Sequence, residues 1–155
     1  NKLINDKIKK IYPYAIEDLS KQIENIDYGI FVDSGPLHLA KILNKKGLLI
    51  ITSVHSKYLL SDFNTIKVMN NNYKSQYCTA PCGLTNLINY KNKVGCYDSL
   101  KINFKNIIKL NQYQSLQRGD LKEKYIDFTI NPVGCIEKID IKELNKILMN
   151  ELITP

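Results

Sequence analysis

Hydrophobic and polar positions alternate with two different periods in the first half of the chain. Apolar residues recur every three or four positions over 16–26, with charged and polar residues between them, which predicts an amphipathic helix. Short, nearly continuous apolar runs follow at 28–32 and 48–51, and such runs are typical of strands buried on both faces of a parallel sheet. The pattern predicts a helix over 37–43 between these strands and a third strand over 65–69.

This alternation of helices and strands with short connections is typical of parallel α/β folds. We predict an α/β fold with a Rossmann-like parallel sheet, an irregular cysteine-bearing segment over 70–95, and C-terminal helices. Pro36 is expected at the first position of the second helix, and Gly47 is expected to end that helix. Residues 1–112 are predicted to form a partial Rossmann-like domain, and residues 113–155 a C-terminal extension packed on it.

An internal repeat marks the second half of the chain. The frame N-x-V-G-C-x-acidic-x-aliphatic-x-Ile occurs at 92–102 and again at 131–141, and an amphipathic pattern follows each copy. Two copies are too few for a solenoid, so we interpret them as a duplicated unit of a cysteine turn and a helix. Between the copies, the alternation over 125–130 predicts a strand.

The basic charge changes this picture little. The formal net charge is +7, but Arg118 is the only arginine, and the lysines are scattered without a block of five or six like charges. This distribution indicates compositional bias rather than phosphate recognition, so no nucleic-acid partner is expected. Weak attraction to an anionic membrane surface is compatible with the charge.

Hydropathy and cysteine content indicate where in the cell the protein is expected. No apolar run reaches the roughly 18–20 residues that cross a bilayer, and the start of the sequence has no signal-peptide core. Four cysteines in 155 residues fall below the density of a disulfide scaffold. We therefore expect a cytoplasmic protein with reduced thiols and, at most, peripheral contact with the inner membrane.

The segment 33–40, with the sequence DSGPLHLA, contains the clearest candidate binding site. It follows a predicted strand and opens a predicted helix, and open α/β sheets bind ligands at the carboxyl ends of their strands. A helix N-terminus there offers free N–H groups and a positive dipole end to a phosphate. Gly35 would allow close backbone approach, and Ser34 and His38 would donate to the same anion.

Asp33 fits the phosphate interpretation less directly. It is expected to cap the helix, to orient His38, or to accept a hydrogen bond from a sugar or ribose hydroxyl. An ordinary N-cap followed by a turn would explain the same residues without any ligand.

The segment closely resembles the D-[TS]-G-x-x-H-[LI] motif of family 9 glycosyltransferases, which include the lipopolysaccharide heptosyltransferases. The order of helices and strands over 16–51 also fits this family. In addition, Cys78, Cys82 and Cys96 are similar to a cysteine-bearing element of many members. The resemblance covers about residues 14–110.

The resemblance implies a GT-B enzyme, of which this chain would contain part of the C-terminal, donor-binding domain. The diphosphate of an ADP-heptose-like nucleotide sugar would be bound by the residues of the motif, Asp33, Ser34, Gly35, His38 and Leu39. The sugar would pass to a lipopolysaccharide or another glycan or lipid-linked acceptor of the cell envelope. No cofactor or metal is implied, since the donor is a substrate, and the general base would lie in an N-terminal acceptor domain or second chain.

Two alternatives remain open from the sequence. The family often has a Gly-rich turn where this chain has residues 52–56, which favours a noncatalytic accessory or remnant module of the same fold. The other alternative is a zinc-stabilised nucleic-acid-binding module, with the thiolates of four cysteines as ligands and His55 as a possible substitute. These cysteines are Cys78, Cys82, Cys96 and Cys135. Their spacing departs from paired C-x2-C knuckles, and the ordinary interpretation is that they are buried free thiols, which pack like small apolar residues.

Overall fold

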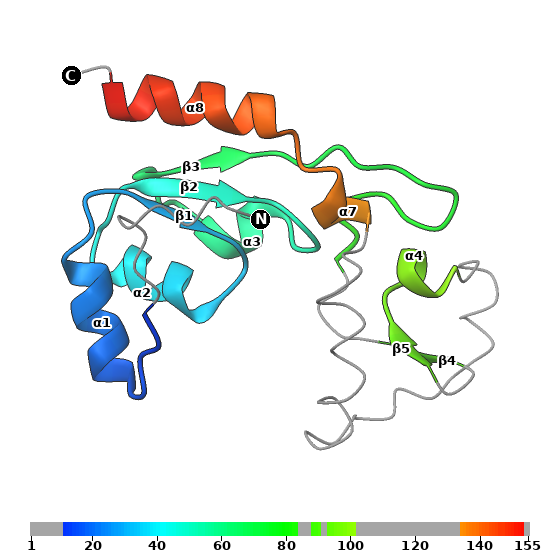
Figure 1. Cartoon of the computed structure of the whole chain (residues 1–155), viewed down its shortest axis with the longest axis horizontal. Helices are drawn as coiled ribbons and strands as arrows, with labels where there is room; N and C mark the ends of the chain where they lie inside the picture. Colours follow the sequence, from blue (N-terminus) through cyan, green and yellow to red (C-terminus); the bar gives the residue numbers. More distant parts are fainter. Residues whose placement is uncertain (1–10, 84–87, 91–92, 102–133, 154–155) are drawn as a thin grey trace, which may run out of the picture.

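The computed structural model describes residues 11–83, 88–90, 93–101 and 134–153. The described part has an α/β fold built on a small, open, parallel sheet with the strand order β1-β2-β3 (Figure 1). The strands are β1 (Gly29–Phe31), β2 (Gly47–Ile50) and β3 (Ile66–Met69). All three predicted strands are therefore confirmed, and the sheet is parallel as the sequence pattern predicted.

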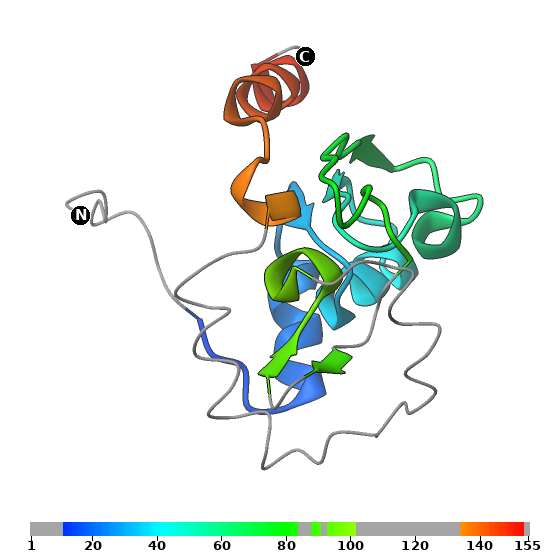
Figure 2. The same cartoon turned by 90° about the vertical axis from the view of Figure 1, so that its right-hand side faces the viewer.

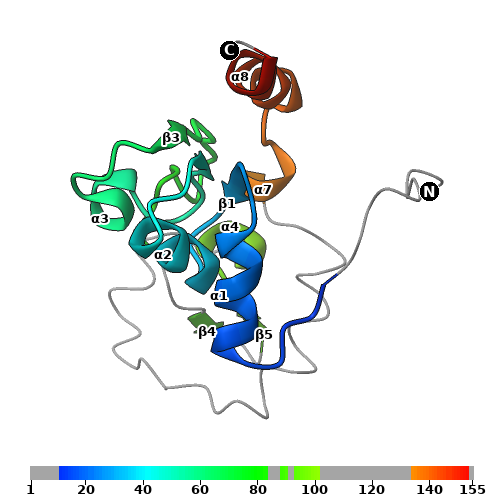
Figure 3. The ribbon, with the colours of Figure 1, turned by 90° about the vertical axis from the view of Figure 1, so that its left-hand side faces the viewer.

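Helices cover both faces of this sheet. On one face lie α1 (Ile16–Glu24), α2 (Gly35–Ile42) and α3 (Ser56–Leu60), and on the other lies α8 (Ile141–Ile153) (Figures 1 and 3). The connections β1-α2-β2 and β2-α3-β3 both put their helices on the same face. Because the strands are parallel, the loops that follow them lie at the same end of the sheet, the carboxyl end of the strands.

The central strand β2 divides the core into two clusters. All four of its residues are buried, and alternate side chains point to opposite faces. Leu49 and Ile51 pack with α1, α2 and α3, whereas Leu48, Ile50 and Met69 pack against α8. The residues of α8 in this second cluster are partly buried: Leu144, Ile147 and Leu148. The helix that follows the second copy of the repeat therefore packs on this face of β2 and β3.

A smaller group of elements lies beyond the carboxyl ends of the sheet strands (Figures 1 and 2). It contains the antiparallel strands β4 (Ile88–Tyr90) and β5 (Lys93–Gly95), followed by α4 (Tyr97–Leu100). The short helix α7 (Gly134–Glu137) lies between this group and α8. The prediction that 70–95 is irregular was therefore wrong for β4 and β5.

The start and the end of α2 both differ from the predictions. Helix α2 begins at Gly35, two residues earlier than predicted, so Pro36 is its second residue rather than its first. The prediction that Gly47 ends α2 was wrong, because Asn44 adopts the left-handed conformation there with a φ of 50°. Gly47 instead opens β2 opposite Gly29, where a Cβ would lie 2.6 Å from the ring of Phe31.

Some predictions concern residues outside the described part of the chain. These are the strand over 125–130, the helix after the first repeat copy, and the division between residues 112 and 113. In the described part, no helix is long and apolar enough to cross a membrane.

Candidate functional site

The predicted phosphate-binding residues lie in and after the turn between β1 and α2, at the carboxyl end of β1. Ser34 is the N-cap residue of α2 and has extended backbone angles, but its side chain does not cap the helix. Its hydroxyl instead donates to the carbonyl oxygen of Val32 over 3.0 Å. The carbonyl of Ser34 accepts from the N–H of Leu37 over 3.1 Å, which closes the first turn.

Gly35 provides a backbone donor in this turn that is unbonded in the described part of the chain. Pro36 has no N–H, and that of Leu37 is already bonded to Ser34. No described residue accepts from the Gly35 N–H. A Cβ at Gly35 would have no atom within 4 Å, so no other described segment packs against the Cβ side of this residue. The Gly35 N–H is therefore a backbone donor that is left without a partner among the described residues at the N-terminus of α2, where anions bind favourably.

The other predicted residues divide into exposed and packed positions. Asp33 and His38 are exposed, and no hydrogen bond or ion pair within the described residues involves either side chain. Asp33 precedes the N-cap position, so the structure does not place it as the capping residue. Leu39 is half-buried and packs against the core cluster, where it holds α2 on the sheet. The exposed side chains are free to contact a ligand, whereas Leu39 contributes by positioning the helix.

The loop after β2 has a different organisation. His55 is the N-cap of α3, and its Nδ1 accepts from the N–H of Lys57 over 3.2 Å. The carbonyl of Ser53 accepts from the N–H of Gly83 over 2.7 Å. Residues 52–56 therefore include the N-cap of α3 and a backbone acceptor that holds Gly83.

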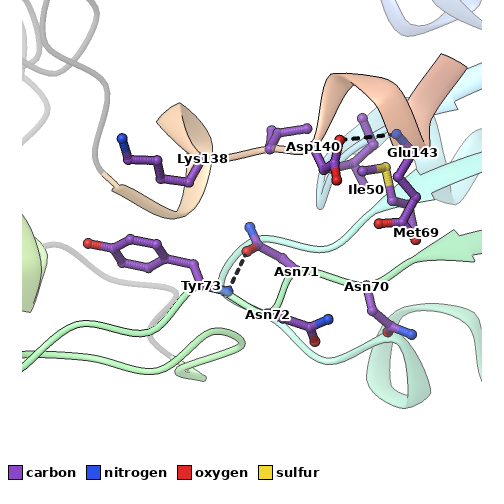
Figure 4. Close-up of a pocket in the computed structure, with 10 residues that line it drawn as sticks. Ile50, Met69, Asn70, Asn71, Asn72, Tyr73, Lys138, Asp140 and Glu143 are labelled. Atoms are coloured by element: carbon purple, nitrogen blue, oxygen red, sulfur yellow. Dashed lines mark hydrogen bonds between the residues drawn. The ribbon is translucent and has the colours of Figure 1, made fainter.

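A cavity of about 310 Å³ opens at the carboxyl ends of β2 and β3 (Figure 4). Its floor includes Ile50 and Met69, and residues 70–73 form one side. The connection between α7 and α8 lies across from them, at residues 138–140, with Glu143 in the first turn of α8. None of the five predicted donor-binding residues lines this cavity. The sequence analysis did not predict this cavity. Three consecutive asparagines directly after the predicted third strand could have indicated a polar site at the end of that strand.

Asn71 joins the two sides of this region. It is 8% exposed, its Nδ2 donates to the carbonyl of Cys135, and its Oδ1 accepts from the N–H of Tyr73 over 3.0 Å. Figure 4 shows the second of these bonds as a dashed line. Both ends of the amide are therefore used to attach the segment before α8 to the loop after β3.

The four cysteines lie on three segments that meet in this same region. All are free thiols, and Cys82 is exposed whereas the other three are partly buried. Burial and the charges of Cys96, Cys78 and Cys82 raise the pKa of Cys135 to about 11. Burial also raises the pKa of Cys78, with smaller contributions from Asp98, Cys82 and Cys96. Among the described residues, no three His, Cys, Asp or Glu side chains already stand in an arrangement that could hold a metal ion.

No protein-family model, curated protein or solved structure matches the chain. The interpretation of the candidate site therefore depends on its own residues and geometry.

Replacement of Asn71 with alanine tests the connection between the loop after β3 and α7. We expect the free energy of unfolding to fall by about 1–3 kcal/mol, because the change leaves a carbonyl and an N–H in a buried place without their partner. Asn72→Ala is the matched control, since Asn72 is exposed. Urea denaturation followed by circular dichroism measures both variants. Equal losses in the two variants would show that the Asn71 bonds do not hold these segments together.

Proposed function

We propose that this chain contributes the donor-binding part of a family 9-like glycosyltransferase with a GT-B architecture. The observation that supports this proposal is the turn at the carboxyl end of β1. There the sequence DSGPLH joins a parallel strand to a helix, with a Gly35 N–H that no described residue accepts from and an exposed His38. This order of strand, turn and helix is what binding of a diphosphate at a helix N-terminus requires.

The proposed chemistry is the transfer of a heptose-like sugar from a nucleoside diphosphate to a hydroxyl of a cell-envelope glycan. Negative charge builds up on the diphosphate as its bond to the sugar breaks. The Gly35 N–H, the positive end of the α2 dipole and the His38 imidazole would stabilise this charge. Asp33 would accept a hydrogen bond from a sugar or ribose hydroxyl. An acceptor domain, on the same polypeptide or a second chain, would supply the general base.

Two observations favour a second candidate, a noncatalytic accessory module of the same fold. The Ser34 hydroxyl donates to the backbone of its own turn, and the loop after β2 is committed to starting α3. Both features reduce the number of groups that are free to bind a donor. A module of this kind would keep the sheet and act through partner chains.

Calorimetric titration with ADP, UDP, GDP and their sugar conjugates tests the proposed function, with adenosine, uridine and guanosine as phosphate-free controls. We expect one diphosphate to bind saturably to one site per chain. Its parent nucleoside should bind roughly tenfold or more weakly, because it lacks the charge-assisted hydrogen bonds to the turn. Equal affinity for nucleoside and diphosphate, or no binding by the folded chain, would contradict donor binding and favour the accessory module.

A further inference from the structure

Three cysteine-bearing segments converge on the side chain and backbone of Tyr73. The carbonyl of Tyr73 accepts from the N–H of Ala80 over 2.8 Å, which folds back the segment that contains Cys78 and Cys82. An isolated antiparallel bridge between Lys74 and Thr79 supports the same fold-back. The chain thus reverses direction between Tyr73 and Ala80, so that Cys78 lies in the fold-back and Cys82 directly after it.

The ring of Tyr73 brings in the other two segments. Its hydroxyl donates to Oδ2 of Asp98 in α4 over 2.7 Å, and Cys96 is the N-cap residue of that helix. The ring also lies against Gly134, where a Cβ would be only 2.2 Å from the Tyr73 hydroxyl oxygen. Cys135 follows directly, and its carbonyl accepts from Asn71. One tyrosine therefore contacts the immediate neighbourhood of Cys96 and of Cys135.

Hydrogen bonds near two of the sulfurs resemble those that support bound thiolates. Sγ of Cys96 accepts from the N–H of Ser99 over 3.5 Å at the start of α4. Cys78 lies in a turn in which Ser75 Oγ accepts from the Cys78 N–H over 3.0 Å and lies 4.0 Å from its Sγ. Such outer contacts orient thiolate ligands and reduce the charge on the sulfur.

The four thiols also lie near one another. Cys135 is affected electrostatically by Cys78, Cys82 and Cys96, and Cys78 is affected by Cys82 and Cys96. This agrees with the contacts of Tyr73 and Asn71, which bring the three cysteine-bearing segments together.

We propose that Cys78, Cys82, Cys96 and Cys135 together bind one thiophilic transition-metal ion, zinc or iron(II). Four sulfur ligands from a chain suit a tetrahedral site for either metal. Each thiol loses its proton as its sulfur bonds to the ion, so one ion releases four protons and leaves a tetrathiolate with a net charge of 2−. The described side chains do not yet present three ligands in place, so binding would draw the three segments around Tyr73 together.

This site differs from the proposed donor-binding turn and does not depend on it. The ion would join the fold-back after β3, α4 and α7, which among the described elements are short and depend on few backbone hydrogen bonds. Its role would be structural, because four protein ligands leave no open position for a substrate.

Elemental analysis of the full chain, purified under reducing conditions and reconstituted separately with zinc and with iron(II), tests the proposal. We expect one ion per chain and its loss in Cys96→Ser and Cys135→Ser, with His55→Ala as the control that retains the metal. Which metal binds more tightly distinguishes zinc from iron. Cobalt(II) titration of the unmodified chain should produce the absorption bands of a tetrahedral tetrathiolate site, which keeps the test valid if the serine variants do not fold.

Two results would overturn the proposal. The first is a folded, reduced chain that takes up neither zinc nor iron and shows no such cobalt bands. The second is undiminished metal content in a folded variant with all four cysteines replaced by serine.

Discussion

Leu49→Ala is expected to lower the free energy of unfolding by about 2–5 kcal/mol. Leu49 is completely buried in the central strand, where it pairs with Phe31 of β1 and Val68 of β3. Truncation removes apolar contacts and leaves a cavity that neighbouring strands, fixed by backbone hydrogen bonds, cannot fill. A loss of this size is a large fraction of the stability of a domain of this length.

Ile42→Ala is the control for this substitution. Ile42 is 76% exposed at the end of α2, so its truncation should change the free energy of unfolding by less than about 0.5 kcal/mol. Urea denaturation at equilibrium measures both variants, with an unchanged slope confirming that the unfolded states are comparable. Similar losses for Leu49 and Ile42 would contradict the placement of β2 at the centre of the core.

His38→Ala is expected to weaken binding of a nucleoside diphosphate by roughly 10- to 150-fold. This range corresponds to the loss of one hydrogen bond to a charged group, about 1.5–3 kcal/mol. The substitution should leave the fold intact, because His38 is exposed and makes no bond within the described residues.

The second histidine of the chain provides a matched control for this prediction. His55 caps α3 in the loop after β2, so His55→Ala should reduce stability slightly while leaving diphosphate affinity within about twofold. Calorimetry on both variants makes the comparison. Unchanged affinity in His38→Ala, or an equal loss in His55→Ala, would remove His38 from the proposed site.

The parallel sheet could be predicted because each of its strands is recognisable from a few consecutive residues. Strands β1, β2 and β3 are short apolar runs, and buried parallel strands need such runs whatever surrounds them. The start of α2 is similarly local, since it is set by a turn of consecutive residues. In contrast, α3 has only five residues, too few for a hydrophobic period to appear, and it depends on the His55 cap.

Tertiary contacts explain what the sequence pattern could not reveal. Gly47 looked like a helix end, but its real constraint is the ring of Phe31, which lies across Gly29 and Gly47. The convergence on Tyr73 depends on bonds to residues far along the chain, such as Asp98. The candidate turn after β1 was therefore predictable as a unit, and the sequence raised a four-cysteine site as an alternative, whereas the cavity and the contacts of Tyr73 were not predictable.

The proposed donor site is tested most directly by amide NMR of the labelled chain during titration with the tightest-binding nucleoside diphosphate. We predict that the largest shift changes fall on the amides of the turn between β1 and α2, above all Gly35, with smaller changes on residues 70–73 beside the cavity. The same experiment on His38→Ala should require more ligand to reach the same shifts. Saturation with the largest changes at the cavity, and none at Gly35, would contradict a diphosphate site at the start of α2.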